Sequence, residues 1–183
     1  MAGDTEKRTY QNAGMTITAV TPEHFPAFME LVTEYAATLA DSGARVRFTN
    51  TRESIEHALF SEPPLMEAII AFDQGEPAGL ASWDVSYHLM TGRSIMDVKH
   101  YYVRRGHRSR PLALSLLSYM LNLAVRRGYW RVEGRVGGRN TAVQRMYSSL
   151  RAEKLDHITF RLDEPAIAMW ASWPGKPKSK QQS

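Results

Sequence analysis

The sequence predicts a single domain of the α/β (α+β) class, with a mixed, mostly antiparallel central sheet that carries helices on both faces. Apolar residues recur along the chain with alternating strand-like and helix-like periods, which is the primary signal for secondary structure. The two kinds of segment also follow one another rather than forming separate blocks, as in layered α/β domains. A chain of 183 residues with 43% hydrophobic content is long enough for one core and short for two.

The first half of the chain is predicted to form a strand, two helices and a hairpin. Thr21 supplies a helix cap and Pro22 suits a first helical position, so a helix begins there. Residues 73–77 favour a turn between two apolar runs, which is typical of a β-hairpin. In chain order these elements are a strand at 15–20, helices at 22–40 and 51–60, and paired strands at 68–72 and 78–83.

The second half is predicted to alternate strands and helices after a loop at 87–92. Its first helix is apolar on nearly every side, as expected of a helix that lies on a sheet, and Gly128 marks its end. In chain order the elements are a strand at 94–103, a helix at 111–127, a strand at 129–136, a helix at 140–150 and a last strand at 155–162.

The composition narrows the class of protein. The chain has no cysteine, which excludes disulfides, thiolate catalysis and cysteine-based metal sites. No apolar run has the length of a membrane span or the character of a signal peptide, so we expect a cytoplasmic protein with no membrane partner. We expect residues 15–170 to form the domain, with residues 1–14 and the basic tail at 171–183 flexible.

Positive charge is concentrated in the stretch from Val98 to Arg151. It contains twelve Lys or Arg residues and one acidic residue, Glu133, for a net +11. The whole chain is only +4, so the remaining residues carry a net −7. Such an asymmetry indicates an anionic partner for this stretch.

A turn inside this basic stretch has the features of a phosphate site. A strand ending at Val103, a loop at 104–110 and a helix from Pro111 would direct backbone N–H groups and the positive helix end to one point. Arg108 and Arg110 would add charge suited to a diphosphate. The chain has neither a Walker loop nor a dinucleotide fingerprint. On spacing alone, a basic loop that merely caps a helix explains the pattern equally well.

The residues around and after this turn resemble the GCN5-related N-acetyltransferase (GNAT) superfamily. The family signature is a strand end, a basic turn, an apolar helix, and then an Asn at a helix start followed by a Tyr seven residues later. The order of elements from Met15 to Asp163 also follows the family. The counterparts here are Tyr101-Tyr102-Val103, Arg108 to Ala113, Leu116-Leu117, Asn140 and Tyr147.

The resemblance implies that acetyl-CoA is the cosubstrate and an amine the acceptor. Backbone groups of the central strand would bind the pantetheine arm and the turn would bind the pyrophosphate. Tyr147 would donate a proton to the leaving thiolate, although a core aromatic is the alternative reading. The residues that the resemblance assigns to acetyl-CoA are Tyr101, Val103, Arg108, Ser109, Arg110, Leu112, Ala113 and Asn140.

The turn departs from the family pattern at Pro111 and Ala113, which replace the two glycines. Alanine fits the pattern, but proline has no N–H to offer a phosphate. The two neighbouring arginines and Ser109 can compensate through charge-assisted hydrogen bonds. The departure implies an altered mode of CoA binding, or a member of the family that keeps the fold without the catalysis.

The sequence leaves the general base open. Asp97, Glu133, His100, His88 or a chain of waters could take the proton of the amine, and each side chain could instead be a structural polar group. The six histidines show no spacing typical of metal ligands, so we expect no metal.

More arginines are present than one CoA needs. We expect the surplus to form a solvated surface, and the alternative is a basic face for an acidic protein or a nucleic acid. No nucleic-acid-binding motif accompanies the charge. The acceptor, a small molecule or a protein, and the oligomeric state, monomer or homodimer, are not specified by any motif.

Overall fold

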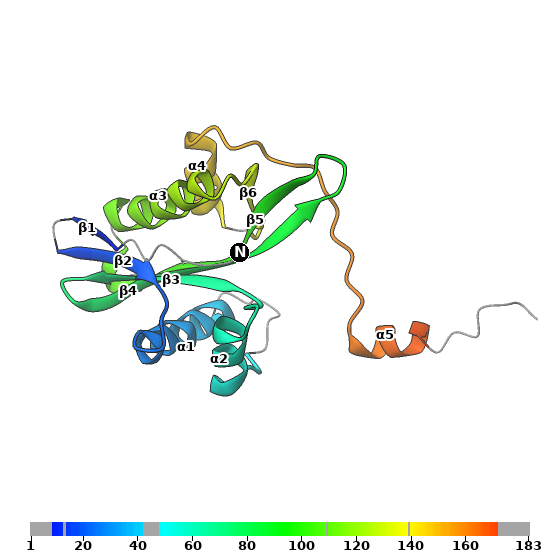
Figure 1. Ribbon diagram of the computed structural model, residues 1–183, viewed down its shortest axis with the longest axis horizontal. Coiled ribbons are helices and arrows are strands. Elements are labelled where there is room, and N and C mark those ends of the chain that lie inside the picture. Colours follow the sequence, from blue (N-terminus) through cyan, green and yellow to red (C-terminus); the bar gives the residue numbers. More distant parts are fainter. Residues whose placement is uncertain (1–8, 13, 42–47, 109, 139, 172–183) are drawn as a thin grey trace, which may run out of the picture. The chain divides into compact units, whose positions relative to one another are not determined.

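A computed structural model of the protein describes residues 9–12, 14–41, 48–108, 110–138 and 140–171 (Figure 1). They divide into two compact units, which meet in sequence between Arg135 and Val136. In chain order the elements are β1 (Tyr10–Asn12), β2 (Met15–Ala19), α1 (Phe25–Asp41), α2 (Arg52–Phe60), β3 (Glu67–Asp73), β4 (Glu76–His88), β5 (Arg93–Val103), the 3-10 turn η1 (Arg105–His107), α3 (Arg110–Arg126), β6 (Arg131–Gly134), α4 (Thr141–Ser149) and α5 (Glu164–Ala171).

The first unit is built on a sheet whose strands lie in chain order from β1 to β6. Neighbouring strands are antiparallel except for β5 and β6, which are parallel because α3 carries the chain back between them. The predicted fold class, a mixed and mostly antiparallel sheet, is confirmed. The short strand β1 was not predicted, and it falls within the segment at 1–14 that we expected outside the domain.

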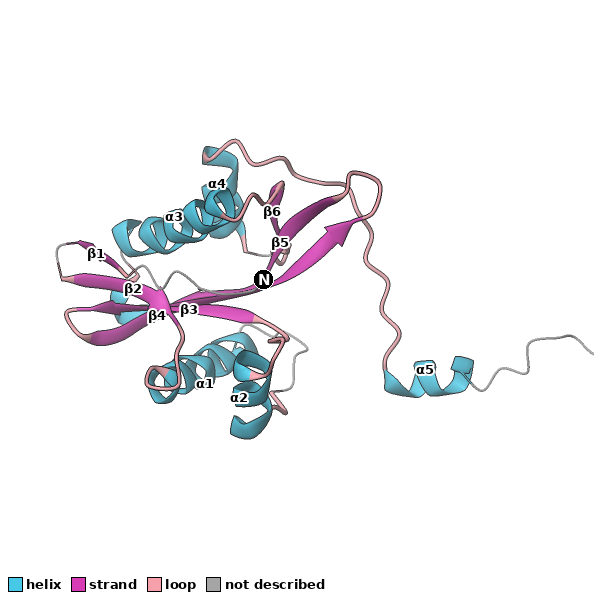
Figure 2. Ribbon diagram, in the orientation of Figure 1, coloured by secondary structure: helices cyan, strands magenta, loops and turns pink. Residues whose placement is uncertain are grey.

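Helices cover both faces of this sheet (Figure 2). On one face, Phe25, Phe28 and Leu31 of α1 pack with Ile55 of α2 against Leu80 and other buried strand residues. Part of the apolar side of α1 is thus buried against the sheet, as in an amphipathic helix.

Helix α3 lies on the opposite face and approaches β4 closely. Leu112, Leu116 and Met120 are fully buried along it. A Cβ atom added to Gly79 of β4 would lie 3.7 Å from Leu116 Cδ2 and 3.0 Å from the Tyr102 carbonyl oxygen. The contact with Leu116 would be an ordinary one, whereas the approach to the backbone carbonyl of β5 would be tight, so β5 rather than the helix disfavours a side chain at this position.

A pair of side chains caps the start of α2. The Thr51 Oγ1 atom accepts a hydrogen bond from the Ser54 N–H at 3.2 Å, and Ser54 Oγ accepts one from the Thr51 N–H at 3.1 Å. This reciprocal pair is a capping box, and it begins α2 where predicted. Helix α1 starts at Phe25, later than the predicted residue 22, because Thr21 to His24 form a turn.

Strands β4 and β5 form a hairpin longer than predicted. Their pairing extends to His88 and Arg93, so the first residues of the predicted loop at 87–92 belong to β4. A bulge lies nearer the middle of the hairpin, where Ser82 pairs with His100 and Trp83 with Val98. Residue 99 is therefore the extra residue of β5 at the bulge.

In the second unit, the predicted strand at 155–162 is wrong. These residues form neither strand nor helix, and the helix α5 after them was not predicted. Ile158, Phe160 and Leu162 have the alternation of a strand but are 81%, 90% and 60% exposed. A strand needs hydrogen-bonding neighbours as well as an alternating pattern, and among the described residues no strand pairs with this segment.

No helix in the described part of the chain is both long enough and apolar enough to span a membrane.

Candidate active site

The most distinctive feature of the first unit is the point at which β5 loses one of its two neighbours. Strand β6 pairs with β5 from Ile95 to Val98 and ends at Gly134. Strand β5 continues to Val103 and remains paired with β4 along this second half. The sheet therefore opens beside the second half of β5, within the first unit.

The register shows which backbone groups face this opening. The Arg104 N–H donates to the Ala78 carbonyl of the β4 side at 2.8 Å. Since backbone groups alternate in direction along a strand, those of Tyr102 face β4, and those of Tyr101 and Val103 face the other way. The Val103 carbonyl accordingly accepts a bond from Arg108 Nε, at 3.2 Å. This orientation suits the pantetheine contacts assigned to Tyr101 and Val103, which stay a prediction.

The side chain of Tyr101 joins β5 to α3. Its hydroxyl donates a hydrogen bond to the carbonyl of Ala113 in the first turns of that helix. The ring thereby holds the helix start against the end of the strand, while the side chain of Val103 is buried. If either residue contacts a ligand along the opening, the backbone is the part that does so.

The basic turn follows directly. After η1, Arg108 is exposed and reaches back to the end of β5. Helix α3 begins at Arg110, one residue before the predicted start, so Pro111 occupies its first turn, where a missing N–H is tolerated. Leu112 is fully buried and could contribute only its backbone, whereas Ala113 is half-buried. Ser109 lies outside the described residues, and for Arg110 only the backbone is described.

Two other basic residues of the turn have structural partners. Arg104 forms ion pairs with Glu30 and with Glu34 of α1, the latter at 2.9 Å between Nε and Oε2. His107 Nδ1 lies 3.1 Å from Asp73 Oδ2 at the end of β3. These contacts fix the turn to the rest of the unit, so Arg104 and His107 are less available to a phosphate than Arg108.

Two of the candidate bases are carboxylates bound to cations. Asp97 Oδ2 accepts a bond from Lys99 Nζ at 2.5 Å and lies 3.9 Å from Arg135 Nη2. Lys99 also pairs with Asp84, at 3.2 Å. Glu133, the register partner of Asp97, lies 3.4 Å from Arg131 Nη1. These partners favour a structural role for both carboxylates.

His100 differs from the two carboxylates. Its ring centroid lies 5.8 Å from that of Tyr35. The residue keeps an exposed part, but partial burial of the ring lowers the pKa of His100 below its ordinary value of 6.5, with Asp84 opposing this effect and Lys99 acting in the same direction. The imidazole is thus mainly neutral at neutral pH and able to accept a proton. His88, by contrast, stacks edge-on against Trp130 near the hairpin tip, at 5.4 Å.

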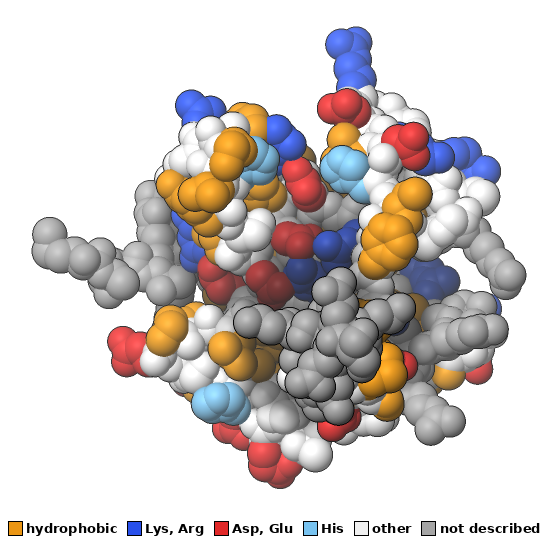
Figure 3. All heavy atoms as spheres, turned by 90° about the vertical axis from the view of Figure 1, so that its right-hand side faces the viewer, with side chains coloured by type: hydrophobic (Ala, Val, Ile, Leu, Met, Phe, Trp, Pro, Cys, Tyr) orange, Lys and Arg blue, Asp and Glu red, His pale blue; other side chains and the backbone are white. Residues whose placement is uncertain are grey.

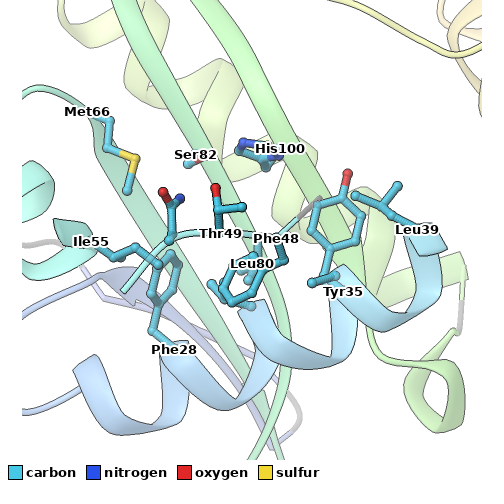
Figure 4. A pocket seen from close by; sticks show the side chains of 13 residues that line it. Phe28, Tyr35, Leu39, Phe48, Thr49, Ile55, Met66, Leu80, Ser82 and His100 are labelled. Carbon is cyan, nitrogen blue, oxygen red and sulfur yellow. The ribbon is translucent and has the colours of Figure 1, made fainter. Parts of the chain in front are cut away.

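His100 also lines a cavity of about 200 Å³ between α1, α2, residues 48–50 and the sheet (Figure 4). No pattern in the sequence indicated this cavity, because apolar residues of α1 that line it have the same spacing as residues buried in the core. The lining residues are Phe28, Val32, Tyr35, Ala36, Leu39, Phe48, Thr49, Asn50, Ile55, Met66, Leu80, Ser82 and His100.

Asn140 and Tyr147 belong to the second unit. The Asn140 side chain caps α4 by accepting a hydrogen bond from the Val143 N–H at 3.3 Å. Tyr147 is half-buried, and burial raises the pKa of its hydroxyl above 10.0. The phenol is therefore protonated at neutral pH, as a proton donor must be. Its role, and that of Asn140, stay predictions.

Many basic residues of the stretch from Val98 to Arg151 have partners in the same unit. Arg127 Nη1 lies 2.7 Å from Glu67, and the Arg131 guanidinium lies 3.5 Å from the centre of the Trp130 ring. Acidic and basic side chains lie next to one another toward the middle of the face shown in Figure 3. Among the described Lys and Arg residues of the stretch, those with an acidic partner include Lys99, Arg104, Arg127, Arg131 and Arg135.

Comparison with known families decides the class of the protein. Residues 27–150 match the model of the acetyltransferase (GNAT) family. The chain belongs to the GNAT family. This match covers α1 to α4, including the open half of β5 and the basic turn, so the resemblance seen in the sequence is confirmed. No match was found among curated proteins.

Solved structures of other proteins share the fold. An integron cassette protein from the mobile metagenome of V. cholerae is 16% identical, with a TM-score of 0.72 over 88% of this chain and 99% of that one. A ribosomal-protein-alanine N-acetyltransferase from Brucella melitensis is 20% identical, with a TM-score of 0.62 over 81% and 98%. An aminoglycoside N-acetyltransferase in complex with CoA is 14% identical, with a TM-score of 0.65 over 87% and 99%. At these identities the likeness concerns the fold.

Proposed function

We propose that the protein transfers an acetyl group from acetyl-CoA to a primary amine by direct attack. The observation that carries this proposal is the opening beside the second half of β5, which leads to the start of α3. A strand edge offers alternating N–H and C=O groups to an extended amide-containing chain, and a helix start favours a phosphate. In CoA, the pantetheine arm is the extended chain with amides, and the pyrophosphate follows it.

In the proposed complex, the backbone of Val103 binds the pantetheine amides and Arg108 binds the pyrophosphate. Ser109, Arg110 and the N–H groups of the first turn of α3 complete the phosphate site. Pro111 removes one of these N–H groups, and the exposed Arg108 guanidinium offers a charge-assisted bond in its place. Asn140 starts α4, which carries Tyr147.

The reaction needs one base and one acid. The amine must lose a proton before its nitrogen attacks the thioester carbonyl, and the thiolate that leaves must gain one. Tyr147 is proposed as the donor to the thiolate, because burial raises its pKa and keeps the hydroxyl protonated. The amide and the free thiol of CoA are the products.

Binding of acetyl-CoA tests the first part of this proposal. A ligand that binds only the folded protein raises the melting temperature, and it protects the amides that it covers from hydrogen exchange. We expect acetyl-CoA to raise the melting temperature. We also expect it to slow amide hydrogen exchange in residues 101–113, which mass spectrometry measures. The absence of both effects at millimolar acetyl-CoA would contradict the proposal.

The role of Tyr147 has its own test. Tyr147→Phe should lower kcat by about 10²-fold or more, the usual contribution of a general acid, with little change in the Kd of acetyl-CoA. Tyr129→Phe is a matched control, because its hydroxyl contacts Arg127 in the first unit. Equal turnover by Tyr147→Phe and the wild type would remove Tyr147 from the mechanism.

A further inference from the structure

Among the described residues, none of those that line the cavity beside His100 is an Asp, Glu, Lys or Arg. Helix α1 contributes Phe28, Tyr35 and Leu39, and α2 contributes Ile55. The polar groups among the lining residues are hydroxyls, one amide and the imidazole of His100. A ligand with several ammonium groups would leave charges unpaired in such a cavity, at a high cost in desolvation.

The polar end of the cavity lies on the half of β5 that has lost its neighbour. His100 and Ser82 pair across β5 and β4, immediately beyond the bulge (Figure 4). Val98, on the other side of the bulge, is the last residue of β5 paired with β6. A group bound in the cavity and a thioester lying along the opening would therefore approach the same segment of β5.

The size of the cavity restricts the ligand further. Drug-sized ligands occupy pockets of about 300–1,000 Å³. The cavity, at about 200 Å³, is smaller and suits a group the size of one amino-acid side chain. Phe28 and Tyr35 present aromatic surface, which favours a ring or a branched alkyl group.

We propose that this cavity is the acceptor site and that the acceptor is a primary amine on one small, uncharged aryl or alkyl group, with its nitrogen beside His100. The proposal rests on the proposed acetyl transfer and adds the class of amine. It differs from a site for a polycation, which would need carboxylates around the ligand.

In the proposed step, His100 takes one proton from the ammonium ion. The nitrogen lone pair then forms the C–N bond with the acetyl carbonyl carbon, and the C–S bond breaks with its electron pair on sulfur. The second proton of the amine leaves to water, and the thiolate is protonated as described above. Tyr35 packs against the imidazole, and Asp84 and Lys99 are the charged groups that affect it.

The acceptor class is tested with 2-phenylethylamine, 3-methylbutylamine, tobramycin and an Ala-initiated peptide as acceptors. Release of CoA is followed with a thiol reagent, and the absence of cysteine from the chain leaves no protein background. We expect kcat/KM to be at least about 10-fold higher for the two apolar amines, which corresponds to ~1.4 kcal/mol. Faster turnover of tobramycin or of the peptide would overturn the proposal.

Cavity variants test the location. Ala36 lines the cavity, whereas Ala37 is exposed on the same helix. Ala36→Phe should lower kcat/KM for 2-phenylethylamine by about 10-fold or more through steric exclusion, and Ala37→Phe should leave it unchanged. Phe48 is 47% exposed and lines the cavity. Phe48→Asp adds a carboxylate to the wall and should also lower kcat/KM for 2-phenylethylamine. Equal kinetics for Ala36→Phe and Ala37→Phe would place the acceptor elsewhere.

The role of His100 requires a pH profile. For the wild type, kcat/KM should fall as the pH drops below about 6.5, where the imidazole becomes protonated. His100→Gln should lower kcat and remove that dependence, whereas loss of a merely structural contact would leave the profile in place. A profile unchanged in shape would contradict the assignment.

The two levels of proposal fail in different ways. In the first case, acetyl-CoA raises the melting temperature and tobramycin or the peptide is turned over faster than the apolar amines. This result supports acetyl transfer and rejects the apolar acceptor. Absence of the acetyl-CoA shift rejects acetyl transfer itself. The Ala36→Phe variant should keep the wild-type shift with acetyl-CoA, which shows that it is folded and that its defect concerns the amine.

Discussion

The two halves of β5 have the same backbone conformation and different surroundings. From Ile95 to Val98 the strand lies between β4 and β6, and Ile95, Met96 and Val98 are buried. Beyond the bulge, β4 is its only strand partner among the described residues, and Lys99 and His100 are exposed. The second half still buries Tyr102 and Val103, but it also presents backbone groups along the opening and the imidazole of His100. The bulge marks the change.

The largest effect should come from proline on the side of β5 that faces β4. Tyr102 is 6% exposed and stacks on Tyr35 at 5.1 Å, and its N–H faces β4. Tyr102→Ala should cost about 3–5 kcal/mol of unfolding free energy from lost packing. Tyr102→Pro should cost about 1–3 kcal/mol more, because a ladder bond is lost as well. Urea denaturation measures both.

The same pair of substitutions at Val103 should behave differently. Its N–H faces the opening, where proline is compatible with an edge strand. Val103→Pro should then be nearly as stable as Val103→Ala and should bind acetyl-CoA about 10-fold more weakly, measured by calorimetry. If proline lowers the unfolding free energy relative to alanine by the same amount at positions 102 and 103, the two sides of the strand are not distinct.

Two arginines of the turn offer a smaller contrast. Arg108→Ala should weaken acetyl-CoA binding by about 10-fold through loss of a charge-assisted bond, and should reduce the salt dependence of binding. Arg104→Ala should instead cost about 1 kcal/mol of stability, because it removes the partly exposed ion pairs with Glu30 and Glu34. A stronger effect of Arg104→Ala than of Arg108→Ala on the Kd would reverse these assignments.

Tyr101→Phe should have a modest effect. It removes the bond from the hydroxyl to the Ala113 carbonyl and leaves the backbone at the opening unchanged. We expect a loss of about 0.5–1.5 kcal/mol in unfolding free energy, with acetyl-CoA affinity within about 3-fold of the wild type. A large loss of affinity with intact stability would mean that the hydroxyl itself contacts the ligand.

The smallest effect concerns the pH dependence of stability. The pKa of His100 in the folded protein is lower than its ordinary value of 6.5, so the unfolded chain binds this proton first as the pH falls. His100 therefore contributes stability that is present above pH 6.5 and decreases below it. His100→Asn should flatten the slope of unfolding free energy between about pH 7 and 5. If His100→Asn leaves the slope of unfolding free energy against pH unchanged, the pKa of His100 is not lowered in the folded protein.

The sequence predicted the parts of this molecule that follow local rules. The span of α2, the apolar helix α3 and the strand that ends at Val103 agree with the structure because each depends on neighbouring residues. The basic turn was recognised for the same reason, and its contacts with acetyl-CoA stay predictions. The predicted start of α1 at Thr21 and Pro22 does not agree, because the helix begins at Phe25.

Features that depend on distant residues were not predicted. The pattern at 155–162 is that of a strand, but pairing depends on what lies next to it. The ion pairs of Arg104 and Arg127 join residues 60 or more positions apart, so the surplus arginines were expected to form a solvated surface rather than ion pairs within the unit. The cavity beside His100 escaped notice because core residues and cavity walls share one apolar pattern.

Arg104 joins the two proposed half-sites. Its guanidinium connects the turn after β5 to Glu34, and the next residue of α1 is Tyr35, in the wall of the cavity. A shift of the turn when one substrate binds would thus reach the wall that receives the other. Thermodynamic reciprocity then requires each substrate to change the affinity of the other by the same factor. Calorimetric titrations of each substrate with and without its partner should show that coupling in the wild type and a smaller one in Arg104→Ala.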